Sequence, residues 1–173
     1  LSGETSIGSF PIESVKIMAR IIERTEEVAL DQIPPLKHSP ATKGGAITKA
    51  ATEVGSTVGA KFLVAFTQSG DSARRMSRLR SPIPMLALTP EIGTYNRLAL
   101  SWGVESMLTK VVNHTDEMVM QVDSILIDSK RVNIGDLVLI VAGSPPGIPG
   151  SINAMRVHKI GDAVGGVAAA YRK

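Results

Sequence analysis

Hydrophobic positions along the chain follow several different periods, and each period predicts a kind of element. Between residues 11 and 29 they recur at helical spacing with charged residues on the opposite side, which predicts one amphipathic helix. From residue 46 onward, short segments with helical spacing alternate with short apolar runs that are typical of strands. The expected helices are 46–60, 72–80, 91–102 and 115–130, and the expected strands are 61–66, 84–88, 104–110, 136–143 and 152–160.

This alternation predicts an α/β fold, a three-layer sandwich around a mostly parallel sheet of about five strands. The run DLVLIVAG at 136–143 is continuously apolar, as a strand covered on both faces should be. Residues 152–160 alternate apolar and polar side chains, which indicates a half-buried strand or a strand at the edge of the sheet. On this interpretation His158 is expected at the strand surface.

Proline and glycine divide the chain into parts. The stretch LDQIPPLKHSPATKGG contains three prolines and ends in two glycines, which favours a linker over a long helix. We therefore expect residues 1–30, a linker at 31–45, an α/β body at 46–161 and a flexible Gly- and Ala-rich tail at 162–173. Because the chain starts with Leu and not Met, we expect a piece of a longer or processed protein.

Composition removes several classes of function. The chain has no cysteine, which excludes disulfides, thiol catalysis and Cys-ligated metals. A net charge of +3 from scattered basic residues, with only 3% aromatic residues, argues against a nucleic-acid partner. No apolar stretch approaches the roughly 20 residues that span a bilayer, so no membrane partner is expected. We find no nucleophile elbow, Walker loop or metal triad, and predict no metal site.

The loop TQSGDS, which follows the first expected strand of the body, has the composition of an anion site. Thr67, Ser69 and Ser72 offer hydroxyl donors, and Gly70 allows close approach of the backbone at the start of a helix. Asp71 opposes this interpretation, since its carboxylate would repel a phosphate. A strand-to-helix turn capped by Ser or Asp explains the same residues, and the loop alone leaves both interpretations open.

A second unusual loop, GSPPGIPGS at 143–151, follows the most apolar strand. Pro145, Pro146 and Pro149 stiffen it, while glycines such as Gly147 free it. This alternation suits a lid over a ligand, and it equally suits a tight crossover into an antiparallel edge strand.

Three stretches together carry a resemblance to a known family. They are LSGETSIGSFPIESVKIMARIIERTE, then VAFTQSGDSARRMSRLRSPIPMLALTP, then GDLVLIVAGSPPGIPGSINAMRVHKI. In this order they resemble the C-terminal portion of pyruvate kinases, in which an L-S-G-E-T loop ends the catalytic barrel. The resemblance covers almost the whole chain up to Gly161.

The resemblance implies a fold and an activity for the whole enzyme. Residues 1–30 would be the last loop and helix of a (β/α)8 barrel, and the last strand of the following domain would be antiparallel at the sheet edge. Ser2, Glu4 and Thr5 would flank the active site, whose principal catalytic residues and magnesium and potassium sites lie outside this chain. The whole enzyme would be a cytoplasmic homotetramer that transfers phosphate from phosphoenolpyruvate to ADP, whereas this fragment alone would not be catalytic.

The resemblance also implies a binding site for a phosphorylated allosteric activator. The effector-binding residues would be Thr67, Ser69, Gly70, Asp71, Ser72 and Gly147, with residues 145–150 closing over the ligand. Asp71, and the short segment 113–136 without an Arg-bearing insertion, favour a monophosphate over fructose 1,6-bisphosphate.

Two other hypotheses stay open at this point. In one, the chain is an independent phospholigand-binding or assembly module without kinase activity. Alternatively, the α/β body serves subunit contacts alone, with the strand 152–160 pairing across a two-fold axis and burying Met155, Val157 and Ile160.

Overall fold

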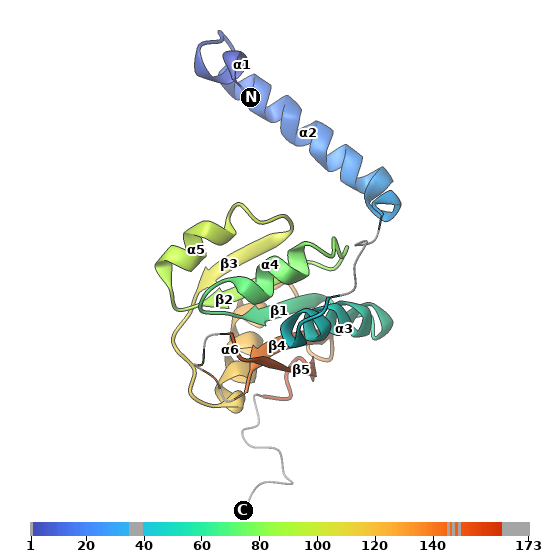
Figure 1. The fold of residues 1–173 in the computed structure, drawn as a ribbon, viewed down its shortest axis with the longest axis vertical. Coiled ribbons are helices and arrows are strands. Elements are labelled where there is room, and N and C mark those ends of the chain that lie inside the picture. The colour runs from blue at the N-terminus through green and yellow to red at the C-terminus, as the bar shows by residue number, and fades with distance from the viewer. Residues whose placement is uncertain (1, 35–39, 145, 147, 149, 164–173) are drawn as a thin grey trace, which may run out of the picture. The chain divides into compact units, whose positions relative to one another are not determined.

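The computed structural model describes residues 2–34, 40–144, 146, 148 and 150–163. Contacts within the chain divide it into two compact units, the N-terminal unit Leu1–Pro35 and the C-terminal unit Leu36–Lys173 (Figure 1). Each unit is described by itself.

The N-terminal unit is a helical segment with α1 (Gly3–Ser6), α2 (Pro11–Ala29) and the 3-10 turn η1 (Leu30–Gln32). Pro11 stands at the first position of α2, where its missing N–H costs nothing, and the expected helix is confirmed. None of the residues described in α1 and α2 is buried. The apolar stripe of α2 is therefore exposed within its own unit.

The C-terminal unit is built on a five-stranded sheet. Its elements are α3 (Lys43–Thr57), β1 (Phe62–Phe66), α4 (Asp71–Ser77), β2 (Met85–Thr89), α5 (Ile92–Leu98), β3 (Val104–Leu108), α6 (Thr115–Asp128), β4 (Leu137–Gly143) and β5 (Ile152–Lys159). The strand order is β3-β2-β1-β4-β5, with parallel pairing except between β4 and β5. The predicted fold class, with an antiparallel last strand at the edge, is confirmed.

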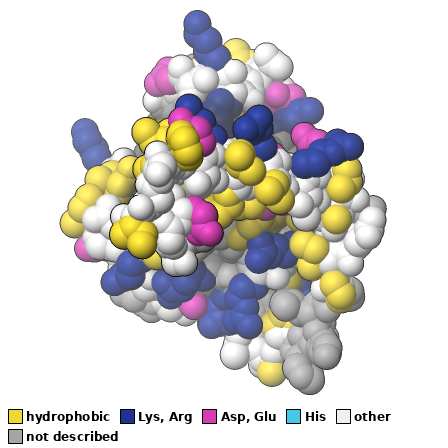
Figure 2. All heavy atoms as spheres, turned by 90° about the horizontal axis from the view of Figure 1, so that it is seen from above, with side chains coloured by type: hydrophobic (Ala, Val, Ile, Leu, Met, Phe, Trp, Pro, Cys, Tyr) yellow, Lys and Arg dark blue, Asp and Glu magenta, His cyan; other side chains and the backbone are white. Residues whose placement is uncertain are grey.

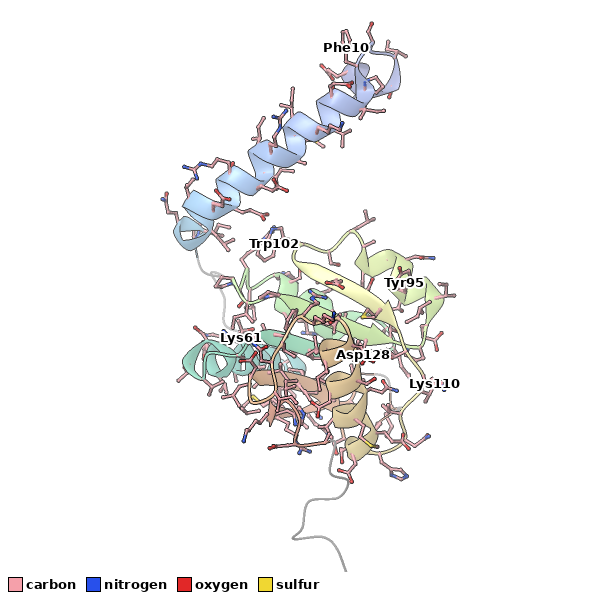
Figure 3. All side chains as sticks on the ribbon, turned by 180° about the vertical axis from the view of Figure 1, so that it is seen from behind. Phe10, Lys61, Tyr95, Trp102, Lys110 and Asp128 are labelled. Carbon is pink, nitrogen blue, oxygen red and sulfur yellow. The ribbon has the colours of Figure 1, made fainter. Side chains whose placement is uncertain are left out.

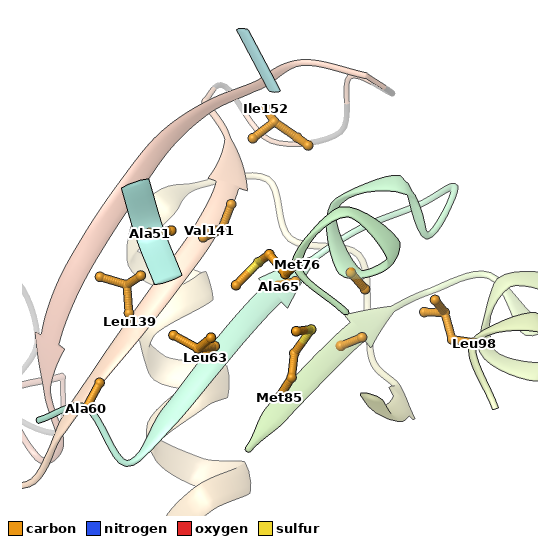
Figure 4. Packing of buried hydrophobic residues seen from close by; sticks show 12 residues of the cluster. Ala51, Ala60, Leu63, Ala65, Met76, Met85, Leu98, Leu139, Val141 and Ile152 are labelled. Atoms are coloured by element: carbon orange, nitrogen blue, oxygen red, sulfur yellow. The ribbon is translucent and has the colours of Figure 1, made fainter. Parts of the chain in front are cut away.

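Helices cover both faces of the sheet, α3 and α4 on one side and α6 on the other (Figure 1). The core under α3 and α4 contains Ala51, Ala73, Met76, Leu63, Leu139 and Val141 (Figure 4). The core under α6 contains Val122, Leu126, Val64, Leu86, Val138 and Ile140. Because both faces are covered, the central strands are continuously apolar, as their sequences predicted.

The predicted boundaries shift where capping and turn chemistry decide them. The helix expected at 46–60 begins at Lys43, because Thr42 Oγ1 accepts a hydrogen bond from Gly45 N at 3.1 Å and caps the helix. The helix expected at 91–102 ends at Leu98. A turn then leads to Gly103, whose positive φ of 65° directs the chain into β3.

A register shift between Ala142 and Gly143 changes which face the start of β5 presents. Ile152 packs with the core under α3 and α4, whereas His158 faces α6. The expectation that His158 lies at the surface is wrong: its side chain is 2% exposed, and Nε2 lies 2.7 Å from Asp123 Oδ1. The expectation that Ile160 is buried by pairing between subunits is also wrong, since Ile160 is already fully buried in the core under α6.

Asp123 also holds the chain that follows β5. Its Oδ2 accepts hydrogen bonds from Gly161 N and Ala163 N, both at 3.1 Å. Ala163 packs against the core under α6. The first residues of the segment expected as a tail are thus attached to α6, and residues 164–173 lie outside the described residues.

Candidate functional site

A pocket opens at the carboxyl ends of the parallel strands, where ligands collect in open α/β sheets. Its empty volume is about 660 Å³. The described residues that line it follow β1 (Thr67, Gln68, Ser69, Asp71, Ser72), β2 (Pro90), β3 (Thr109, Lys110, Val111, Val112) and β4 (Pro146, Ile148, Gly150, Ser151), with Phe66, Leu88, Met118, Gly143 and Ile152 beside them.

The loop TQSGDS forms one wall of the pocket through internal hydrogen bonds. Thr67 Oγ1 accepts from Gly70 N at 2.9 Å, and Ser69 Oγ accepts from Asp71 N at 3.4 Å. Gly70 has a φ of 82° and is the N-cap residue of α4, without a side-chain cap bond. A Cβ at this position would lie 3.2 Å from Leu98 Cδ2, so the turn and the packing of α5 both require glycine.

Ser72 is the predicted site residue that offers a free donor to this space. Ser72 is 3% exposed and lines the pocket. Among the described residues, its hydroxyl has no hydrogen-bond partner. A hydroxyl at a pocket wall can donate a hydrogen bond to a ligand oxygen that reaches it.

Asp71 lines the pocket, and its carboxylate forms an ion pair with Arg75. Arg75 Nε donates to Asp71 Oδ2 at 2.6 Å. Arg74 Nη1 donates to the backbone oxygen of Ser69 at 3.1 Å and so braces the loop. The sequence analysis missed the Asp71–Arg75 pair, although its i,i+4 spacing on a helix was the available signal.

Lys110 is the basic side chain among the described residues that line the pocket (Figure 3). It follows β3, two strands away from the loop after β1. Lys110 was not predicted as a site residue, because its place in the same pocket as Thr67 depends on the strand order. On the face drawn in Figure 2, basic side chains are interspersed with acidic and apolar ones.

The base of the second loop is fixed by the side chain of Asn153. Its Oδ1 accepts from Ser144 N at 2.7 Å, and its Nδ2 donates to Ser144 O at 2.6 Å. Ser151 Oγ donates to Ile148 O at 2.6 Å. Gly147, a predicted effector-binding residue, lies outside the described residues.

The other predicted residues belong to the N-terminal unit. Ser2 precedes α1, Glu4 and Thr5 lie within it, and Thr5 Oγ1 donates to Ser2 O at 3.3 Å. In the described part of the chain, no group of three or more His, Cys, Asp or Glu side chains is placed to hold a metal ion. None of the described helices has the length and apolar character needed to cross a membrane.

The fold is an open-sheet α/β domain with a pocket at the carboxyl ends of its strands. The family described as "Pyruvate kinase, alpha/beta domain" matches residues 45–158, and the chain belongs to that family.

Curated relatives extend the likeness over nearly the whole chain. A pyruvate kinase of Mycobacterium tuberculosis is 48% identical and one of Corynebacterium glutamicum is 43% identical, each over 162 residues. These alignments cover 94% of this chain and 34% of each relative. The chain thus spans about a third of the length of the curated relatives it matches.

A solved structure supports the fold. A crystal structure of a pyruvate kinase from Cryptosporidium parvum superposes with a TM-score of 0.77 at 24% identity, covering 92% of this chain and 32% of that one. At this identity the likeness concerns the fold alone.

Proposed function

We propose that this chain is the regulatory and oligomerisation part of a pyruvate kinase, and that its pocket binds a phosphorylated allosteric activator. The observation that carries the proposal is the position of Ser72, a residue that is 3% exposed and lines the pocket beside Thr67 and Ser69. Family membership and the resemblance of the loop TQSGDS support the same site.

In this proposal the activator acts by favouring one arrangement of a homotetramer. Phosphate oxygens accept hydrogen bonds from Ser72 Oγ and neighbouring donors, and the pocket binds more tightly in one of two arrangements. The ligand then shifts the population toward that arrangement by its difference in affinity.

The whole enzyme would transfer phosphate from phosphoenolpyruvate to ADP, with magnesium and potassium held elsewhere. The described residues of this chain form no acidic cluster that fits these ions. We expect the chain alone to be without catalytic activity, because the resemblance implies that the principal catalytic residues lie outside it. The curated relatives are named pyruvate kinases, and this chain spans 34% of their length. This disfavours the alternative of an independent module without a kinase parent.

The charges of the pocket favour one phosphate over two. Asp71 and Lys110 are the charged side chains among the described lining residues, and their formal charges cancel. Each phosphate monoester brings about −1.5 to −2 charges at neutral pH. A monophosphate, either of a sugar or of a nucleoside, is the proposed ligand class.

A thermal-shift screen tests the site. The chain is titrated with inorganic phosphate, AMP, glucose 6-phosphate, ribose 5-phosphate and fructose 1,6-bisphosphate, because a ligand of the native state raises Tm with the logarithm of its concentration. A monophosphate shift should disappear in Ser72→Ala and weaken in Ser69→Ala, while Ser56→Ala, an exposed change on α3, should leave it unchanged. No shift with any phosphate ligand would refute the site, and much tighter binding of the bisphosphate would refute the ligand class.

A second role in subunit contact is favoured by the outer edge of β5. This strand is last in the sheet order, and Met155 and Val157 are 41% and 42% exposed on it. An exposed strand edge with apolar side chains is suited to pairing with a second copy.

A further inference from the structure

The first turn of α3 has an unusual composition for a helix start. Gly44 and Gly45 stand side by side, although glycine is unfavourable within helices. A Cβ on Gly44 would lie 3.6 Å from Ile152 Cδ1 and 3.9 Å from Arg75 Nε, and a Cβ on Gly45 would lie 2.5 Å from Pro40 Cβ and 3.6 Å from Arg75 Nη1. The guanidinium of Arg75 therefore packs directly on this turn, in space that a larger side chain at position 44 would occupy.

Arg75 joins this turn to the pocket. Its Nε donates to Oδ2 of Asp71, which lines the pocket, at 2.6 Å. Its Nη1 donates to Thr42 Oγ1 at 3.1 Å, and the same oxygen accepts from Gly45 N. One side chain thus connects a carboxylate of the pocket with the N-cap of α3.

An anion in the pocket disturbs this arrangement. A phosphate near Asp71 adds negative charge beside a carboxylate, which is unfavourable unless a cation moves closer. Arg75 contacts Asp71 through Nε and Thr42 through Nη1. A turn of the guanidinium that keeps the Nε bond to Asp71 would carry Nη1 away from Thr42 Oγ1 and toward the phosphate.

We infer that Arg75 couples occupancy of the pocket to the start of α3, by exchanging its bond to Thr42 for a bond to the ligand phosphate. This inference rests on the proposed phosphate site. Thr42 follows closely on the boundary between the two units, between Pro35 and Leu36. The exchange therefore changes the chain where it enters the C-terminal unit.

Because coupling between two sites is reciprocal, a change at Thr42 should alter the affinity of the pocket for its ligand. If the ligand competes with Thr42 for Arg75, removing the Thr42 hydroxyl must tighten ligand binding, although Thr42 does not line the pocket. Thr42→Val should lower the Kd of ribose 5-phosphate about threefold, in keeping with one partly exposed hydrogen bond. Thr42→Ser keeps the hydroxyl and should bind as the unmodified chain does.

A double-mutant cycle separates the coupling from loss of the helix cap. Isothermal titration of ribose 5-phosphate into the 173-residue chain compares Thr42→Val with and without Arg75→Gln. Arg75→Gln alone should weaken binding, because Asp71 is then uncompensated. In that background Thr42→Val should have no effect on Kd.

A second pair of variants leaves the cap in place. Gly44→Leu crowds Arg75 and also Ile152, which lines the pocket, and should tighten binding as Thr42→Val does to the extent that Arg75 is displaced, whereas Gly44→Ala meets only ordinary contacts and should not. If ribose 5-phosphate binds and neither Thr42→Val nor Gly44→Leu changes its Kd, the coupling is refuted. The coupling is equally refuted if Thr42→Val acts to the same extent without Arg75. Absence of binding by every phosphate ligand to the unmodified chain refutes the proposed function itself, and the coupling with it.

Discussion

His158 Nε2 lies 2.7 Å from Asp123 Oδ1, and both side chains are almost completely buried between β5 and α6. A carboxylate oxygen accepts, so the imidazole nitrogen is the donor. The second oxygen of Asp123 accepts from two backbone N–H groups beyond β5, those of Gly161 and Ala163. One carboxylate therefore fastens the edge strand and the following chain to α6.

Replacing Asp123 should destabilise the domain strongly. Asp123→Ala leaves the buried imidazole and two partly buried backbone donors without partners, and we expect a loss of about 3 kcal/mol in the free energy of unfolding. Urea denaturation followed by circular dichroism measures this loss. Asp128→Ala, an exposed change on the same helix, should cost less than about 0.5 kcal/mol. Equal losses in the two variants would contradict the role of the buried carboxylate.

Gly70 should tolerate alanine less well than another glycine with positive φ. Gly70→Ala adds crowding against Leu98 and Thr94 to the backbone strain at a φ of 82°. Gly103→Ala adds strain alone, because no atom lies within 4 Å of its Cβ position. We expect a cost of about 1 kcal/mol for Gly103→Ala and about 2 kcal/mol or more for Gly70→Ala, measured by thermal or urea unfolding. A smaller loss in Gly70→Ala than in Gly103→Ala would contradict this packing.

The strands of the sheet could be predicted because the central ones are short, continuous runs of apolar residues. The segment at 136–143 became β4. Its continuous apolar run was enough to predict a strand covered by helices on both faces. The start of α3 was misplaced by three residues, because a glycine pair is typical of a loop. The structure explains the second glycine by Pro40, whose Cβ would lie 2.5 Å from a Cβ at position 45, and the helix start by the Thr42 cap.

The parts of the site that the sequence did not predict depend on contacts between distant elements. His158 looked like a surface residue, since its partner Asp123 is 35 positions away on another element. Lys110 reaches the pocket only because the strand order places β3 two strands from β1. By contrast, the Asp71–Arg75 pair was readable from its spacing on one helix.

A charge on β5 should separate subunits if this edge forms a contact between copies. Val157→Lys places a cation on an exposed apolar position of the last strand, and in a symmetric contact each copy would face the other's charge. Light scattering after size exclusion should show a smaller particle than for the unmodified chain. Leu100→Lys, on an exposed leucine outside β5, should leave the mass unchanged. An unchanged mass in Val157→Lys would remove this edge from the contact.

Lys110 should contribute to anion affinity through its charge alone. It is the basic side chain among the described lining residues and is exposed, so its attraction for a phosphate is real but screened by salt. We expect Lys110→Gln to raise the Kd of a sugar monophosphate by about two- to fivefold at low salt, and by less at high salt, because an exposed ion pair is worth about 1 kcal/mol or less. Lys159→Gln removes an equal charge from β5 outside the pocket and should change the Kd little. Titration calorimetry at two salt concentrations distinguishes the two variants. If both raise the Kd equally, the effect comes from the net charge of the chain, and Lys110 has no specific place in the site.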